Sequence, residues 1–142
     1  MRNHNCSCHP QPRDYGCEPF VCNLPNAARR NGYFRAAIWT GRYLQLTLMS
    51  IPVGGEIGTE MHGDVDQLIR VESGRARVLT GVCRNDLRES ATVGEGCAIL
   101  IPAGTWHNVV NAGSRPLKLS SLYAPPQHPA GTVHPTKEDA QH

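Results

Sequence analysis

The most constraining feature of this sequence is a series of short apolar runs, separated at close intervals by turn residues. Between Tyr33 and Tyr123, segments rich in Gly, Pro or Asn end each run before it reaches the length of a typical helix. The run from 42 to 51 alternates leucines with Gln45, Thr47 and Met49, the period of two that a half-buried strand shows. Strands are expected at 34–40, 42–51, 67–72, 75–81, 90–93, 97–101, 106–110 and 117–123. This spacing predicts an all-β barrel or sandwich.

Composition indicates a single turn-rich domain. The chain has 142 residues, 39% of them hydrophobic, with 14 Gly and 11 Pro, which is enough apolar material for one core. We expect an irregular, Cys/His-rich leader over residues 1–32, a β-barrel over 33–124 and an irregular tail over 125–142.

Charge and hydropathy exclude two classes of partner. The net charge is +2 without a long basic run, which argues against a nucleic-acid binder. No stretch approaches the roughly 20 apolar residues that a membrane span needs. Residues 1–23 lack the apolar region of a signal peptide, so we expect a cytoplasmic protein.

The leader contains four of the six cysteines: Cys6, Cys8, Cys17 and Cys22. One interpretation is a small zinc site, although the segment lacks the Cys-x-x-Cys spacing of structural zinc sites. The other is disulfides formed on oxidation, or free thiols. We expect Cys83 and Cys97 in the β domain to be ordinary thiols.

Two glycine-marked segments contain residues suited to one metal centre. Glu60 and His62 are two positions apart and would share one face of a strand, and the turn residues after them can return Gln67 to that face. His107 comes from a separate strand after a Pro-x-Gly turn. Two imidazoles and one carboxylate suit a divalent metal with open positions, and the Gln67 amide oxygen is a weaker fourth ligand.

The same two segments resemble the two motifs of the cupin family. The second, Gly96-x5-Pro102-x-Gly104-x2-His107-x3-Asn111, agrees with the family pattern at every position. In the first, the family pattern has His where this chain has Glu60, and Glu where it has Gln67. The resemblance covers roughly residues 34–124 and implies a double-stranded β-helix jelly-roll barrel, often dimeric and often binding Mn, Fe, Zn or Ni.

The two departures leave the ligand charge unchanged. The usual three imidazoles and one carboxylate become two imidazoles, one carboxylate and one neutral amide, as if the carboxylate had moved from the Gln67 position to the Glu60 position. We therefore expect a retained site for a divalent transition metal, held by Glu60, His62, Gln67 and His107. If Glu60 is not a ligand, it is the candidate for proton transfer in catalysis.

Two functions from different classes follow from this site. The first is a metal-dependent enzyme acting on a small polar molecule such as a sugar or organic acid, with isomerase and dioxygenase chemistry both open. Small cupins of this kind are sometimes labelled mannose-6-phosphate isomerase-like, which is a likeness of the barrel. The second is a non-catalytic cupin that binds a small molecule or metal as a sensor or structural protein.

The remaining expectations concern the pocket and the assembly. The sequence has neither a Gly-rich phosphate loop nor an Arg/Lys cluster near the motifs, so nothing in it favours a phosphorylated substrate. Gln45 is a candidate for an inward polar group, and Tyr123 is either a proton donor near the mouth or a rim aromatic. His128 and His134 either fold over the mouth or belong to a mobile tail. The cupin resemblance implies a homodimer, and edge strands near residues 34–48 would need covering.

Overall fold

The computed structural model describes residues 13–141, and β-strands dominate that range. The strands are β1 (Arg35–Thr40), β2 (Gln45–Ile51), β3 (Asp66–Ser73), β4 (Ala76–Gly81), β5 (Arg88–Val93), β6 (Ala98–Ile101), β7 (Trp106–Asn111), β8 (Leu117–Ala124) and β9 (Val133–His134). A helix, α1 (Leu24–Arg30), precedes them, and a 3-10 turn, η1 (Glu138–Gln141), follows. Every strand expected over 33–124 is present, with small shifts at its ends, which confirms the all-β prediction.

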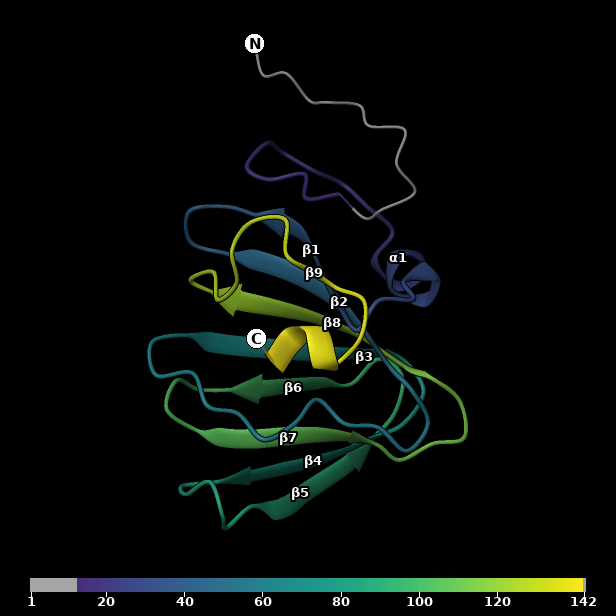
Figure 1. Ribbon diagram of the computed structural model, residues 1–142, viewed down its shortest axis with the longest axis vertical. Coiled ribbons are helices and arrows are strands. Elements are labelled where there is room, and N and C mark those ends of the chain that lie inside the picture. The colour runs from purple at the N-terminus through teal and green to yellow at the C-terminus, as the bar shows by residue number, and fades with distance from the viewer. Residues whose placement is uncertain (1–12, 142) are drawn as a thin grey trace.

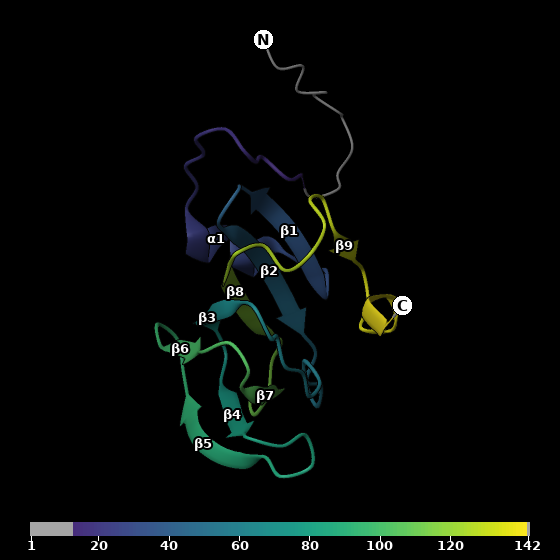
Figure 2. The same ribbon diagram turned by 90° about the vertical axis from the view of Figure 1, so that its left-hand side faces the viewer.

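The strands pair into two antiparallel sheets. The larger has the order β6-β3-β8-β2-β1-β9 and the smaller the order β5-β4-β7. Figure 1 shows the smaller sheet below the larger one, and Figure 2 shows β4, β5 and β7 gathered on one side of the barrel. Since β3 joins the larger sheet and β4 the smaller, the chain crosses between sheets at the Ser73–Gly74 turn, where Gly74 has a positive φ of 100°.

The segment from Gly55 to His62 extends the smaller sheet beside β7. The amide of Ile57 donates to Val109 O at 2.9 Å, and Glu60 and His107 exchange both backbone hydrogen bonds at 2.9 Å. This pairing places the first motif directly against the second.

The interior is divided along the strands into an apolar end and a polar end. At the apolar end, Met49, Leu119 and Val71 are aligned across β2, β8 and β3, and all three are fully buried. Two rows further on, Gln45, Tyr123 and Gln67 are aligned across the same strands and are equally buried. Buried polar groups are normally hydrogen-bonded, so the polar end is where a ligand is expected.

Helix α1 covers part of the outer face of the larger sheet. Asn23 caps its N-terminus, accepting a hydrogen bond from the Asn26 amide at 3.0 Å. A second apolar cluster, which includes Ala28, Ile38 and Leu48, packs beneath it. The leucines of β2 therefore face outward, while its alternate residues face the core. Within residues 13–141, no helix is long and apolar enough to cross a membrane.

Over residues 125–141, the chain is more ordered than the predicted irregular tail. Within it, β9 pairs with β1 through Arg35–His134 and Ala36–Val133. The edge that was expected to need covering near residues 34–48 is therefore covered on the β1 side by β9 of the same chain. Sequence analysis did not predict β9 because a strand of two residues is too short to show a periodic pattern, and its order comes from pairing with a distant strand.

The leader cysteines are only partly within the described range. Cys6 and Cys8 lie outside it, so the zinc and disulfide interpretations of the leader stay predictions. Cys22, Cys83 and Cys97 are exposed free thiols, in agreement with ordinary thiols at Cys83 and Cys97.

The Asn111 side chain connects the end of β2 and the loop after it with the β7–β8 loop. Its Nδ2 donates to the carbonyls of Ile51 at 3.0 Å, Pro52 at 3.2 Å and Arg115 at 2.9 Å, and its Oδ1 accepts from the Gly113 amide at 2.8 Å. The asparagine that ends the second motif is thus a structural residue here.

Replacing this clamp should destabilise the fold. We expect Asn111→Ala to lower the free energy of unfolding by about 2–3 kcal/mol, because it leaves buried carbonyls without a donor. Urea denaturation measures this loss. The exposed turn residue Asn85 is the control, and Asn85→Ala should change stability by less than about 0.5 kcal/mol. Equal effects of the two substitutions would contradict the clamp.

Candidate metal centre

Three side chains from the two motifs converge at the polar end of the barrel. Glu60 and His62 come from the segment beside β7, and His107 comes from β7 itself. Gly104, with a positive φ of 85°, forms the turn before β7, and its amide donates to His62 O at 2.8 Å. The turn that starts β7 is therefore attached to the segment carrying the other two residues.

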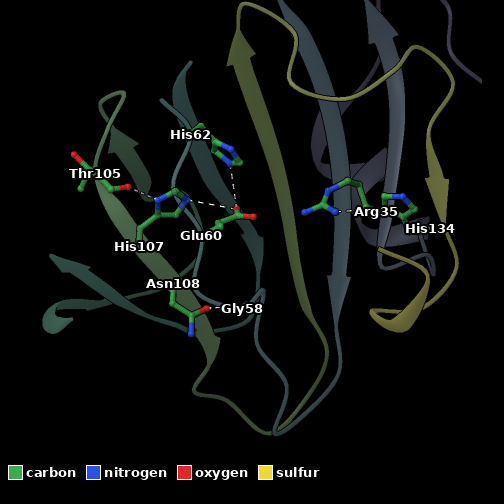
Figure 3. Close-up of polar contacts among 8 residues, drawn as sticks. All are labelled: Arg35, Gly58, Glu60, His62, Thr105, His107, Asn108 and His134. Atoms are coloured by element: carbon green, nitrogen blue, oxygen red, sulfur yellow. Dashed lines mark hydrogen bonds and ion pairs between the residues drawn. The ribbon is translucent and has the colours of Figure 1, made fainter. Parts of the chain in front are cut away.

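The carboxylate of Glu60 bridges the two imidazoles. Its Oε1 lies 3.4 Å from Nε2 of His62 and 3.4 Å from Nε2 of His107, as Figure 3 shows. These contacts are long for hydrogen bonds, and all three atoms are buried without a hydrogen-bond partner in the described protein. Three unpartnered ligand atoms converging on one point are the arrangement that a bound cation would complete.

The residue types and spacing fit a divalent metal. The ligand atoms of Glu60, His62 and His107 all lie within 4.8 Å of one another. A separation of 3.4 Å is close to that of two ligand atoms in a tetrahedral site with bonds of about 2.1 Å. Imidazole is a borderline ligand that suits Fe, Ni and Zn, and carboxylate is a hard ligand that also suits Mn.

The charges in the centre favour an ionised carboxylate. Burial opposes ionisation of Glu60, but the two imidazoles, and Arg35 at longer range, outweigh it and lower its pKa below the ordinary range. Burial also lowers the pKa of His107, yet its contacts with Glu60 and with the Thr105 carbonyl raise it overall. The ionised carboxylate and the two imidazoles therefore favour each other's presence in the metal-free centre.

The tautomer of His107 is set by a backbone contact. Its Nδ1 lies 2.9 Å from the carbonyl of Thr105, which can only accept a hydrogen bond. The proton of the neutral ring therefore sits on Nδ1, and the lone pair of Nε2 faces the centre, as metal-binding histidines require.

Asn108 supports the centre, and sequence analysis did not single it out. Its Oδ1 accepts from the Gly58 amide at 2.9 Å, and its Nδ2 donates to Glu56 Oε1 at 2.7 Å. Figure 3 shows Asn108 holding Gly58, two residues before Glu60. An asparagine inside a strand, where it is disfavoured, is the only signal in the sequence that points to such a role.

Gln67 lies in the same interior but outside the group of three. It is 4% exposed on β3, and both atoms of its amide lack a hydrogen-bond partner in the described protein. Its register partners are Tyr123 on β8 and Ile101 on β6. Its assignment as a fourth ligand stays a prediction.

Aromatic residues continue from the centre to the tail. Tyr123 is fully buried, with its ring 5.9 Å from that of His62 and 5.2 Å from that of His128. His128 in turn lies 6.4 Å from His134. The two tail histidines thus lie over the polar end, and Tyr123 is an interior residue, not a rim aromatic.

Gln45 anchors this part of the tail. Its Oε1 accepts from the amide of His128 at 2.9 Å, and its Nε2 donates to the carbonyl of His128 at 2.8 Å. The expectation that Gln45 points inward is confirmed, and its partners are backbone groups of the tail together with the Thr40 hydroxyl at 3.0 Å.

The charge pairing in the centre predicts the titration of His107. In protein freed of metal by a chelator, Glu60→Gln should lower the pKa of His107, because the carboxylate that raises it is lost while burial remains. Histidine ring NMR signals followed against pH measure the shift. Glu89→Gln, on exposed β5, is the control and should leave His107 unchanged. An unaltered titration in Glu60→Gln would contradict the described pairing.

Comparison with known proteins places this site in a family. The Cupin_2 family, described as "Cupin domain", matches residues 47–124. The uncharacterized protein YrkC of Bacillus subtilis (strain 168) is 52% identical over 128 residues, which cover 90% of this chain and 69% of that protein.

Solved structures agree. The crystal structure of BH2720 from Bacillus halodurans matches with a TM-score of 0.89 at 56% identity, over 91% of this chain and 98% of that chain. A conserved protein with a double-stranded β-helix domain from Klebsiella pneumoniae matches with a TM-score of 0.61 at 20% identity, over 84% of this chain and 100% of that chain, a likeness of fold alone. The chain therefore belongs to the cupin family and has its double-stranded β-helix fold.

Proposed function

We propose that the protein binds a divalent transition metal through Glu60, His62 and His107, with Gln67 as a weaker fourth ligand. The observation that carries this proposal is the convergence of three buried ligand atoms that lack other partners. Gln67 supports it because its buried amide, also without a partner, faces the same interior.

We further propose that the metal-bound protein is an enzyme acting on a small polar molecule such as a sugar or an organic acid. A bound divalent metal would supply Lewis acidity or, as iron, oxygen chemistry, so isomerase and dioxygenase reactions both suit the site. With Glu60 between the imidazoles as a ligand, proton transfer falls to another residue.

His128 is the candidate for that proton transfer. Burial, and Arg35 nearby, lower its pKa to about 4, so the ring is neutral at neutral pH. Its Nε2 has no hydrogen-bond partner in the described protein, so no other group of that range occupies its lone pair. Gln45 accepts a hydrogen bond from the His128 backbone amide, and this contact keeps the His128 ring against Tyr123.

Metal binding should stabilise the protein measurably. At a concentration 100 times its Kd, one of Mn²⁺, Fe²⁺, Zn²⁺ or Ni²⁺ should raise Tm by roughly 8 °C. We expect His62→Gln to abolish most of this shift and Gln67→Leu to reduce it. Gln67→Glu should enlarge it, because a carboxylate binds more strongly than an amide. Differential scanning fluorimetry with elemental analysis provides the readout.

The exposed residue Gln127 supplies the control, since Gln127→Leu should behave as wild type. The shift should also shrink at acid pH, as protons compete for the imidazoles. Absence of any metal-dependent shift in wild type would overturn the proposal. Metal binding without turnover of sugars or organic acids would favour the alternative, a non-catalytic sensor or structural cupin.

We also propose that the protein is a homodimer. The outer face of the larger sheet carries apolar side chains that α1 leaves partly exposed, and two of these, Leu44 and Leu100, are 39% and 71% exposed. Leu68 and Leu122 line the same groove. A second copy seated here would remove this surface from water.

The cytoplasmic location stays a prediction.

The dimer has a direct test. Leu100→Glu should convert the protein from dimer to monomer, because it places a charge in the apolar contact. Val82→Glu is the matched control, since Val82 is 88% exposed in the loop after β4 and should not affect assembly. Light scattering after size-exclusion chromatography measures the mass, and a monomeric wild type would refute the dimer.

A further inference from the structure

A small basic pocket lies directly beside the candidate metal centre. Its volume is about 280 Å³, and four parts of the chain line it. β1 contributes Arg35, the loop before His62 contributes Glu60, the β4–β5 connection contributes Arg84 and the segment after β9 contributes Lys137. Three cationic side chains against one carboxylate give the lining a formal charge of +2. No Arg/Lys cluster was visible near the motifs in the sequence, because these residues meet only in the folded chain.

Arg35 is a buried cation without a counterion. It is 5% exposed, and its Nε has no hydrogen-bond partner in the described protein. Across residues 13–141, no carboxylate lies within ion-pair distance of its guanidinium. Its polar neighbours are the hydroxyl of Tyr123 and Nδ1 of His134, the latter 3.4 Å from Nη1, and neither carries a negative charge. A buried charge is costly unless it is paired, so this guanidinium is suited to an incoming anion.

Arg35 is aimed at the centre. Figure 3 shows its guanidinium directed toward the side of the barrel that carries Glu60, with His134 behind it. Glu60 lines the same pocket, but its Oε1 contacts the imidazoles, 3.4 Å from each. Glu60 attracts Arg35 only at longer range, so the planar fork of Arg35 stays open to another oxyanion.

The other two cations stand at the sides of the pocket. The guanidinium carbon of Arg84 lies 5.8 Å from the ring centre of Trp106, which holds the side chain over β7. The ammonium of Lys137 lies close to Gly58, 3.6 Å from the position that a Cβ atom on this glycine would occupy. Gly58 is two residues before Glu60 in the sequence. Within the described residues, neither cation is engaged in an ion pair, so both are available to a negatively charged ligand.

We propose that this pocket selects a small anionic substrate, whose carboxylate or phosphate binds Arg35 while Arg84 and Lys137 add charge. The inference deepens the proposed enzyme function by naming its substrate class: an oxyanion placed here lies next to Glu60 and hence beside the metal ligands. At about 280 Å³ the pocket lies just below the range of roughly 300–1,000 Å³ that is typical of ligand sites, which limits the substrate to a small molecule.

The test is anion binding to the metal-free protein, so that it does not depend on metal or turnover. Isothermal titration at low ionic strength compares malonate, inorganic phosphate and malonamide, the uncharged counterpart of malonate. We expect malonate or phosphate to bind and malonamide not to bind. The tighter of the two anions indicates whether the substrate carries a carboxylate or a phosphate.

Variants locate the binding. Arg35→Gln should weaken anion binding by about 10- to 100-fold, the loss expected for a charge-assisted hydrogen bond. The double variant Arg84→Gln, Lys137→Gln should weaken it by about 3- to 10-fold, because the charges are more exposed. Arg42→Gln removes an exposed cation at the turn after β1 and should bind as wild type.

Three results would overturn the proposal: equal binding of malonamide, no binding of either anion, or unchanged affinity in the double variant. The double variant alters residues at the side of the pocket, so it tests whether anions bind there even if Arg35→Gln does not fold. A wild type that binds malonate but no metal would contradict the proposed metal function and leave the anion site standing.

Discussion

The antiparallel pairing of the segment 55–62 with β7 is the interaction on which the site depends. Glu60 and His107 exchange two backbone hydrogen bonds, so their side chains emerge next to each other. His62, two residues further on, falls on the same face, and the Gly104 amide holds its carbonyl. The centre is therefore positioned by the main chain before any ligand contributes.

This arrangement has an electrostatic cost that the surroundings offset. Burying a carboxylate is unfavourable by itself, yet Glu60 is flanked by two imidazoles that keep it ionised. The apolar rows at the opposite end of the barrel, with Met49 and Leu119 fully buried, supply the packing that stabilises the fold. One end of the barrel thus provides stability, and the other holds the buried polar side chains of the candidate metal centre.

The residues around the centre come from distant parts of the chain. Asn108 fixes the loop that carries Glu60, and Gln45 fixes the tail that carries His128. Arg35 reaches the same region from β1, across the barrel. The sequence around each of these three residues gives little sign of its role, because that role depends on a partner far away in the sequence.

The sequence by itself determined the strands, the turns and the residues of the centre. Alternation in β2 and glycines such as Gly74 and Gly104, whose positive φ values suit turns, are local properties that a pattern can reveal. The spacing of Glu60, His62 and His107 likewise reflects the family's motifs. Tertiary structure alone decided that β9 joins β1, that Tyr123 lies inside, and that Arg35, Arg84 and Lys137 share one pocket. The physical reason is that strand period and turn conformation are encoded within a few residues, whereas sheet partners and clusters of charge arise from contacts between segments that only folding brings together.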